Sequence, residues 1–307
     1  MATTVVAPVG NSIALAEKYL PLIDEVYKAA SKTAILDTAN DRVRWIGADT
    51  VKMLALSELG MGDYSRNAGF VPGDTTATWE TFQITQDRGR SYQIDVMDND
   101  ETLGQIVGNL LGEVERIHIV PELDAYRFAK MAGTVGIDGA TGDITVGSTN
   151  VKTLISAAEA SMTNNEVPED GRILFISPRC KDALKGNIER RIINSEANVS
   201  YEVEYFDGMR VITVPQNRFC TSITLAQPSA HDGAGGYTPG GKRINFMIVH
   251  PSAVMQVVKH VAPRLFSPAQ NIEADAWRLN YRIYHDCFVL PNKKKGIYLY
   301  SDSTASN

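Results

Sequence analysis

Residues 60–133 read GMGDYSRNAGFVPGDTTATWETFQITQDRGRSYQIDVMDNDETLGQIVGNLLGEVERIHIVPELDAYRFAKMAG. The stretch opens with a glycine-rich turn, continues with strand-like arms and ends in a long helical repeat. Such a layout buries little surface by itself, and a free two-stranded hairpin is marginal in water. We therefore predict a subunit that completes its packing against copies of itself.

The glycine-rich turn spans residues 60–73 and contains Met61, Phe70 and Val71, which we expect to be exposed on an isolated subunit. Apolar and polar residues then alternate from Ser91 to Val96, as in a strand with one covered face. The simplest arrangement is a hairpin that pairs residues 75–85 with residues 89–97 around a turn at 86–88.

A long helix is predicted over residues 101–132. Asp98 and Glu101 can cap its start, and Gly133 is a natural stop. Unbroken, this helix is roughly 48 Å long. Pro121 removes one backbone hydrogen bond and favours a bend, so two shorter helices that meet at Pro121 are the alternative. Its apolar positions are Leu103, Ile106, Val107, Leu110, Leu111, Val114 and Ile117.

The residues before this stretch predict an arm and a lead-in strand. Helical spacing runs through residues 13–30 and is interrupted by Pro21, which predicts a broken helix that packs either on its own domain or on a neighbouring subunit. Residues 42–56 read as extended chain.

The middle of the chain predicts a compact α+β domain. A helix is expected at residues 151–162, a buried strand at 172–177 with a helix opening at Pro178, and a hairpin about Asp207 and Gly208. Residues 136–148 and 227–242 read as loops.

The last part of the chain predicts strands. They lie at residues 244–250 and 253–260, from Trp277 onward, and at 297–300 after the charged turn 293–296.

Composition narrows the class of protein. The chain has 307 residues, a net charge of -6 and no long apolar run, which predicts a soluble globular protein that does not bind nucleic acid sequence-specifically and does not enter a membrane. Its three cysteines, Cys180, Cys220 and Cys287, show no metal-binding or disulfide spacing, which indicates reduced thiols in a cytosolic setting.

No catalytic, cofactor or metal motif is complete. Residues 236–243 match the spacing of a phosphate-binding loop, but Arg243 stands where a magnesium ligand is needed and a strand pattern follows instead of a helix. The histidines form no zinc pair, and no nucleophile signature is present. We therefore predict no enzyme activity, no cofactor and no metal site.

Segments spread over nearly the whole chain resemble the major capsid proteins of tailed bacteriophages. They are ALAEKYLPLIDEVYK from Ala14, GDYSRNAGFVPGD from Gly62, TWETFQITQDRGRSYQIDVMDNDET from Thr78, VPELDAYRFAKMA from Val120, LFISP from Leu174, INFMIVHPSAVMQVVKH from Ile244, PRLFSP from Pro263 and DAWRLNYRIYHDCFV from Asp275.

This resemblance implies an α+β chain with the Hong Kong 97-like capsid fold. Its parts are expected to be an N-terminal arm and lead-in strand (1–48), an extended β-hairpin loop (49–100), a peripheral domain with a long spine helix (101–135 with 244–290) and an axial domain (136–243). Residues 291–307 would form a C-terminal strand and tail that returns to the axial domain.

The resemblance also implies a function and partners. Subunits of this family form pentamers and hexamers that close into an icosahedral virion shell, which is assembled in the host bacterial cytoplasm as a precursor and expands when DNA is packaged. It implies a portal protein as a partner and leaves a decoration protein open. Because the arm-like segment starts within about fifteen residues of Met1, we expect a separate scaffolding protein.

The extended loop supplies the predicted subunit contacts. The charged residues among them make contacts between subunits or are simply solvated, since exposed ion pairs contribute little. The predicted interface residues are Met61, Tyr64, Arg66, Phe70, Val71, Trp79, Arg88 and Arg90. The alternatives are an encapsulin-like nanocompartment shell, which resembles the same fold, and a soluble oligomeric enzyme that uses the middle domain.

Overall fold

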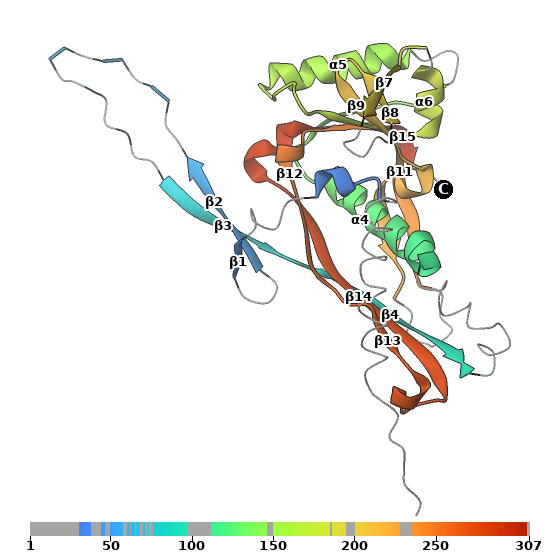
Figure 1. Cartoon of the computed structure of the whole chain (residues 1–307). Coiled ribbons are helices and arrows are strands. Elements are labelled where there is room, and N and C mark those ends of the chain that lie inside the picture. The colour runs from blue at the N-terminus through green and yellow to red at the C-terminus, as the bar shows by residue number, and fades with distance from the viewer. Residues whose placement is uncertain are drawn as a thin grey trace, which may run out of the picture.

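A computed structural model describes most of the chain (Figure 1). The described residues are 31–37, 44–46, 50–57, 60, 61, 63, 64, 66, 67, 70, 73, 76–96, 112–145, 150–184, 186–194, 200–227 and 235–305. The predicted helix at 13–30, the cap at Asp98 and the first part of the long helix lie outside them.

An eight-stranded mixed sheet forms the upper body in Figure 1. Its order is β5-β15-β11-β6-β9-β8-β7, and β10 pairs with the first half of β11. The strands are β5 (Asp138–Thr141), β6 (Ile173–Ile176), β7 (Glu189–Asn194), β8 (Ser200–Phe206), β9 (Met209–Thr213), β10 (Cys220–Leu225), β11 (Tyr237–Val249) and β15 (Ile297–Ala305).

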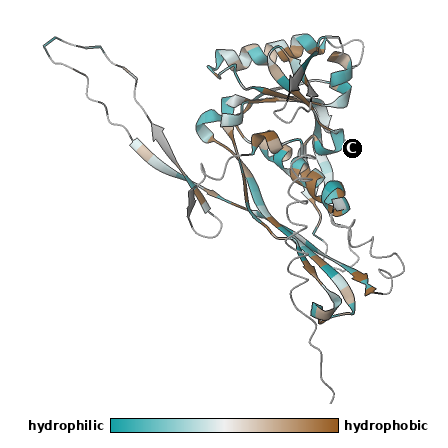
Figure 2. Ribbon diagram, viewed as in Figure 1, coloured by the Kyte–Doolittle hydropathy of each residue, from teal (hydrophilic) through white to brown (hydrophobic). Residues whose placement is uncertain are grey.

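Helices cover both faces of this sheet because successive strand residues point to opposite sides. Leu174 and Ile176 pack with the helix α5 (Val151–Asn164) on one face, where α6 (Pro178–Leu184) also lies. Phe175, between them, meets α4 (Val120–Ala132) on the other face. Figure 2 shows hydrophobic residues in α4 and in the strands beside it.

A second, four-stranded sheet extends below the body. The long strand β14 (Ala276–Val289) is its centre and pairs with β12 (Val254–Val261) and β13 (Arg264–Phe266) on one side and with β4 (Gln86–Asp95) on the other. All its ladders are antiparallel.

A third sheet projects away from the body (Figure 1). It contains β1 (Arg44–Ile46), β2 (Thr50–Ser57) and β3 (Thr76–Gln83), with β2 and β3 paired over their full lengths. The predicted hairpin of residues 75–85 with 89–97 is therefore wrong. Its two arms are strands β3 and β4, which run on through Ile84 and Thr85 without reversing and pair in different sheets.

The long helix is present from residue 112 to 132 and passes through Pro121. A π-helical turn, η3 (Glu115–Ile119), immediately precedes α4 and places Pro121 in the first turn of α4. The helix ends at Gly133, as predicted, so the alternative of two separate helices is not what these residues form.

Several local predictions are confirmed. Helix α5, strand β6 and the start of α6 at Pro178 agree with the expected positions. The β8–β9 hairpin turns at Asp207 and Gly208, whose φ angles of 48° and 80° are the pair that such a two-residue turn requires.

Two predicted loops contain strands. β5 lies inside residues 136–148 and pairs in parallel with β15, and β11 begins at Tyr237 inside the segment read as loose. The expected domain boundary at residue 243 falls within β11, which continues into the centre of the eight-stranded sheet. The short helical turns are η1 (Ala34–Leu36), η4 (Gln216–Arg218), η5 (Pro251–Ala253), η6 (Pro268–Gln270) and η7 (Pro291–Gly296).

Candidate functional site

The projecting hairpin of β2 and β3 presents aromatic and apolar side chains to solvent. Met61 and Phe70 are 106% and 86% exposed, and Tyr64 and Trp79 are also exposed. The rings of Tyr64 and Phe70 meet edge to face, with 5.0 Å between their centroids. Contiguous exposed apolar residues of this kind are typical of protein contact surfaces.

The root of the hairpin, by contrast, is buried. Val51 and Ile84 pack with Met255 and Val257 of β12, and the rings of Phe82 and Phe288 lie 5.2 Å apart. The hairpin is thus fixed where it leaves the body, while its outer half has no covering within the described chain.

The outer edge of β3 is a second candidate for a contact between chains. Among the described strands, β3 pairs only with β2, so its other edge presents backbone N–H and C=O groups to solvent. Residues 76–79 are exposed on both faces of the strand. An open strand edge is a template for pairing with another chain.

The far end of the four-stranded sheet exposes two further apolar residues that sequence reasoning missed. Ile272 is fully exposed and Val261 is partly exposed. Nothing in the local sequence distinguishes them, because exposed isoleucine and valine occur in the same patterns as buried ones. Only the position of β12–β14 beyond the body reveals them.

The predicted contact residues fall into two groups. Those on the hairpin are exposed, whereas Arg88 and Arg90 lie on β4 in the four-stranded sheet, and Val71 lies outside the described residues. The hairpin group is Met61, Tyr64, Arg66, Phe70 and Trp79.

Arg88 joins three parts of its own chain. Its Nε lies 2.6 Å from a carboxylate oxygen of Glu122 on α4, and its Nη1 donates to the backbone oxygen of Ala226 at 2.9 Å. The guanidinium of Arg90 lies 6.0 Å from the centre of the Tyr92 ring. These contacts tie β4 to the helix and to the end of β10.

Two buried cysteines, Cys180 and Cys287, belong to hydrophobic clusters of the body. Burial raises the pKa of Cys180 and of Cys287 to about 12, so both thiols are protonated at neutral pH. Within the described residues no group of three or more His, Cys, Asp or Glu side chains is placed to hold a metal ion. No helix in the described part of the chain is long and apolar enough to span a bilayer.

No protein-family model matches the chain, and no curated protein matches it in sequence. Solved structures do match. A structure from Gordonia phage Cozz has a TM-score of 0.57 at 13% identity, covering 91% of this chain and 86% of that chain. The capsid structure of the cyanophage P-SCSP1u has a TM-score of 0.53 at 13% identity, covering 84% of each chain. This chain has the Hong Kong 97-like fold of tailed-phage capsid proteins.

The same fold extends to a further solved structure, a virus-like particle from Pyrococcus furiosus. It has a TM-score of 0.52 at 10% identity, covering 92% of this chain and 98% of that chain. The structural similarity to these solved structures therefore extends over most of the chain.

Proposed function

We propose that this chain is the major capsid protein of a tailed bacteriophage. It self-assembles as pentamers and hexamers into an icosahedral shell that encloses the double-stranded DNA genome, and it has no enzymatic role. The observation that carries this proposal is the Hong Kong 97-like fold over more than four fifths of the chain, together with an apolar hairpin that its own chain leaves uncovered.

The parts of the fold suit the proposed roles. The β2–β3 hairpin would be the extended loop, residues 112–132 the described part of the spine helix, and the four-stranded sheet the core of the peripheral domain. The eight-stranded sheet with α5 and α6 would form the axial domain, to which β15 returns. One hydrophobic cluster lies between the eight-stranded sheet and the helices α5 and α6, and another lies at the root of the hairpin, which supports this division, while a third cluster joins α4 to both larger sheets.

The proposed contacts between copies begin at the hairpin. Met61, Tyr64, Phe70 and Trp79 would pack on a neighbouring subunit, and the open edge of β3 would lie against it. Burial of these side chains contributes about 25 cal/mol per Å² of apolar area. A separate scaffolding protein and a portal protein are the proposed further partners, and a decoration protein is an additional candidate.

A second candidate is a nanocompartment shell protein that encloses a protein cargo. The likeness to a virus-like particle from Pyrococcus furiosus supports this candidate as well as the phage capsid. The two differ in what the shell contains. Nuclease-protected DNA in particles from infected cells would favour the phage capsid, and a co-purifying protein cargo without DNA would favour the nanocompartment.

The test of assembly is negative-stain electron microscopy with sedimentation velocity on the purified chain, alone and co-expressed with the product of the gene just upstream. Closed shells, or sheets of pentamers and hexamers, are the expected result. Dependence on the upstream product would identify external scaffolding. A persistent monomer or small oligomer in both samples would count against self-assembly and would favour a soluble enzyme.

The hairpin can be tested with matched substitutions. Phe70→Ser and Trp79→Ser should reduce the assembled fraction at least tenfold at a fixed concentration, because each removes apolar area from the proposed contact. Val135→Ser is the control, since Val135 is also 86% exposed but lies after α4, away from the hairpin. If all three variants assemble equally, the hairpin does not contribute to the contact between subunits.

A further inference from the structure

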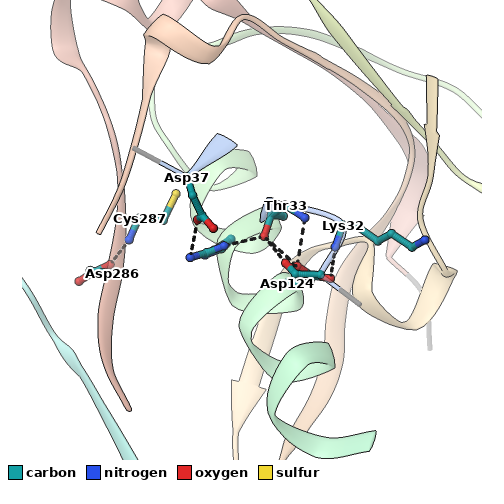
Figure 3. Close-up of polar contacts among 8 residues, drawn as sticks. Lys32, Thr33, Asp37, Asp124, Asp286 and Cys287 are labelled. Carbon is teal, nitrogen blue, oxygen red and sulfur yellow. Dashed lines mark hydrogen bonds and ion pairs between the residues drawn. The ribbon is translucent and has the colours of Figure 1, made fainter. Parts of the chain in front are cut away.

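One turn of α4 holds a segment that lies near the N-terminus. The carboxylate of Asp124 is fully buried and accepts hydrogen bonds from Ser31 Oγ at 2.7 Å, from the Lys32 backbone N–H at 2.9 Å and from Thr33 Oγ1 at 2.7 Å. These residues belong to the anchor segment, residues 31–37. Figure 3 shows the contacts of Thr33 and of the Lys32 backbone with Asp124, while the Lys32 side chain points away.

The same turn holds the other end of the anchor segment. Arg127 is fully buried, donates to Thr33 Oγ1 at 2.9 Å and lies 2.9 Å from a carboxylate oxygen of Asp37. Asp37 in turn forms an isolated parallel bridge with Gln256 of β12. The anchor segment is therefore fixed to the helix by charges at both of its ends.

The opposite side of the turn holds the root of the projecting hairpin. The Tyr126 hydroxyl donates to Asp286 of β14 at 2.8 Å. Asp286 is fully buried and also accepts from the backbone N–H of Thr85 at 2.8 Å and from its hydroxyl at 2.9 Å. Ile84 and Thr85 are the residues through which β3 of the hairpin continues into β4 of the four-stranded sheet.

We infer that residues 124–127 of α4 couple the anchor segment to the root of the projecting hairpin. A helical turn moves as one unit because its backbone hydrogen bonds link each residue to the fourth one along. Release of the anchor segment would take from Arg127 its contacts with Thr33 and Asp37, and would leave Asp124 with the guanidinium of Arg218 at 3.3 Å, which is unfavourable for these two buried charges unless the turn itself shifts. A shift of the turn displaces Tyr126 from Asp286 and so loosens Thr85.

This inference does not depend on the proposed function. It concerns contacts within one chain and is testable on the unassembled protein. Through this coupling, a change at the anchor segment alters the hairpin root, and a change at the hairpin root alters the anchor segment.

Hydrogen exchange measured by mass spectrometry on the full chain tests the coupling. Ser31→Ala removes one hydroxyl donor at Asp124, and Thr85→Val removes one at Asp286. Each single variant should speed exchange at least threefold in the peptide that contains the other site. Independent sites would give a double variant whose fold-increase in exchange rate equals the product of the two single increases to within about twofold. We expect the increase in the double variant to be smaller than this product by more than that margin.

Ser303→Ala is the matched control, because the Ser303 hydroxyl also donates to a carboxylate, that of Asp143, but in the eight-stranded sheet. It should leave both peptides unchanged. If Ser31→Ala does not fold, Tyr126→Phe replaces it and should speed exchange both at residues 31–37 and at Thr85. The inference would be overturned if each variant sped exchange only in its own peptide and if the rate increases of the two single variants multiplied in the double variant.

Discussion

Arg88 on β4 and Glu122 on α4 form an ion pair, with 2.6 Å between Nε and a carboxylate oxygen, and both side chains are largely buried. The pair links the four-stranded sheet to the helix that also covers the eight-stranded sheet. Arg88 was expected at a contact between subunits, and that role stays a prediction. Its guanidinium already serves a contact within the chain.

Arg88→Ala should lower the free energy of unfolding of the unassembled chain by about 1.5–3 kcal/mol, the usual contribution of a hydrogen bond to a charged group. Urea unfolding followed by circular dichroism measures the change. Arg179→Ala, at an exposed position, is the control and should stay within about 0.5 kcal/mol of the unsubstituted protein. If both variants unfold alike, the Arg88 pair does not stabilise the junction.

The pair of Arg127 and Asp37 predicts an asymmetry. Arg127 is fully buried, whereas Asp37 is 35% exposed. Asp37→Asn removes the carboxylate that lies 2.9 Å from this buried positive charge and should cost on the order of 3 kcal/mol. Arg127→Met removes the buried charge itself and replaces it with an apolar chain of similar length, so its cost should be smaller. Thermal unfolding measures the loss of stability in both variants. A larger loss in Arg127→Met than in Asp37→Asn would contradict this account.

His285 predicts how stability changes with pH. Burial, and then the positive charges of Arg127 and Arg88, lower the pKa of His285 from 6.5 to about 3. Its ring packs edge to face against Tyr126, with 5.5 Å between centroids. Between pH 6.5 and 3 the unfolded chain binds a proton at this residue and the folded chain does not, so stability is present above pH 6.5 and is lost as the pH falls.

The slope from this one residue is at most about 1.4 kcal/mol per pH unit. His285→Phe keeps an aromatic ring and removes the titration. Urea unfolding at pH 7 and at pH 5 should therefore show a smaller loss of stability in the variant than in the unsubstituted chain. An equal loss of stability in both proteins would mean that carboxylates, and not His285, cause the loss of stability in acid.

The sequence predicted the local elements well because their signals are local. The turn at Asp207 and Gly208 requires two residues with positive φ, and α4 ends at the predicted Gly133, although the φ of this glycine is -78° and not left-handed. Alternating side chains likewise identified β14.

The pairing of strands was not local and was predicted wrongly. β3 and β4 each alternate and lie next to each other in sequence, which suggested a hairpin, but the one turn-favouring residue of segment 84–88, Asp87, lies inside β4. The true partner of β4 is β14, about 190 residues later, and the buried Asp286 of β14 accepts a hydrogen bond from Thr85, just before β4. The exposure of Ile272 depended on the same long-range arrangement.

The close approach of β4 and β14 gives a last prediction, at Gly89. A Cβ atom at this position would lie 2.9 Å from the backbone oxygen of Tyr281, closer than carbon and oxygen atoms pack, and a strand backbone does not move aside cheaply. Gly89→Ala should therefore lower the free energy of unfolding by about 1–3 kcal/mol. Gly112→Ala is the control, because Gly112 is helical with no atom within 4 Å of an added Cβ, and it should gain up to about 1 kcal/mol. Equal stability of the two variants in urea unfolding would mean that β4 and β14 can separate without loss, and the four-stranded sheet would then not be the rigid base from which the hairpin projects.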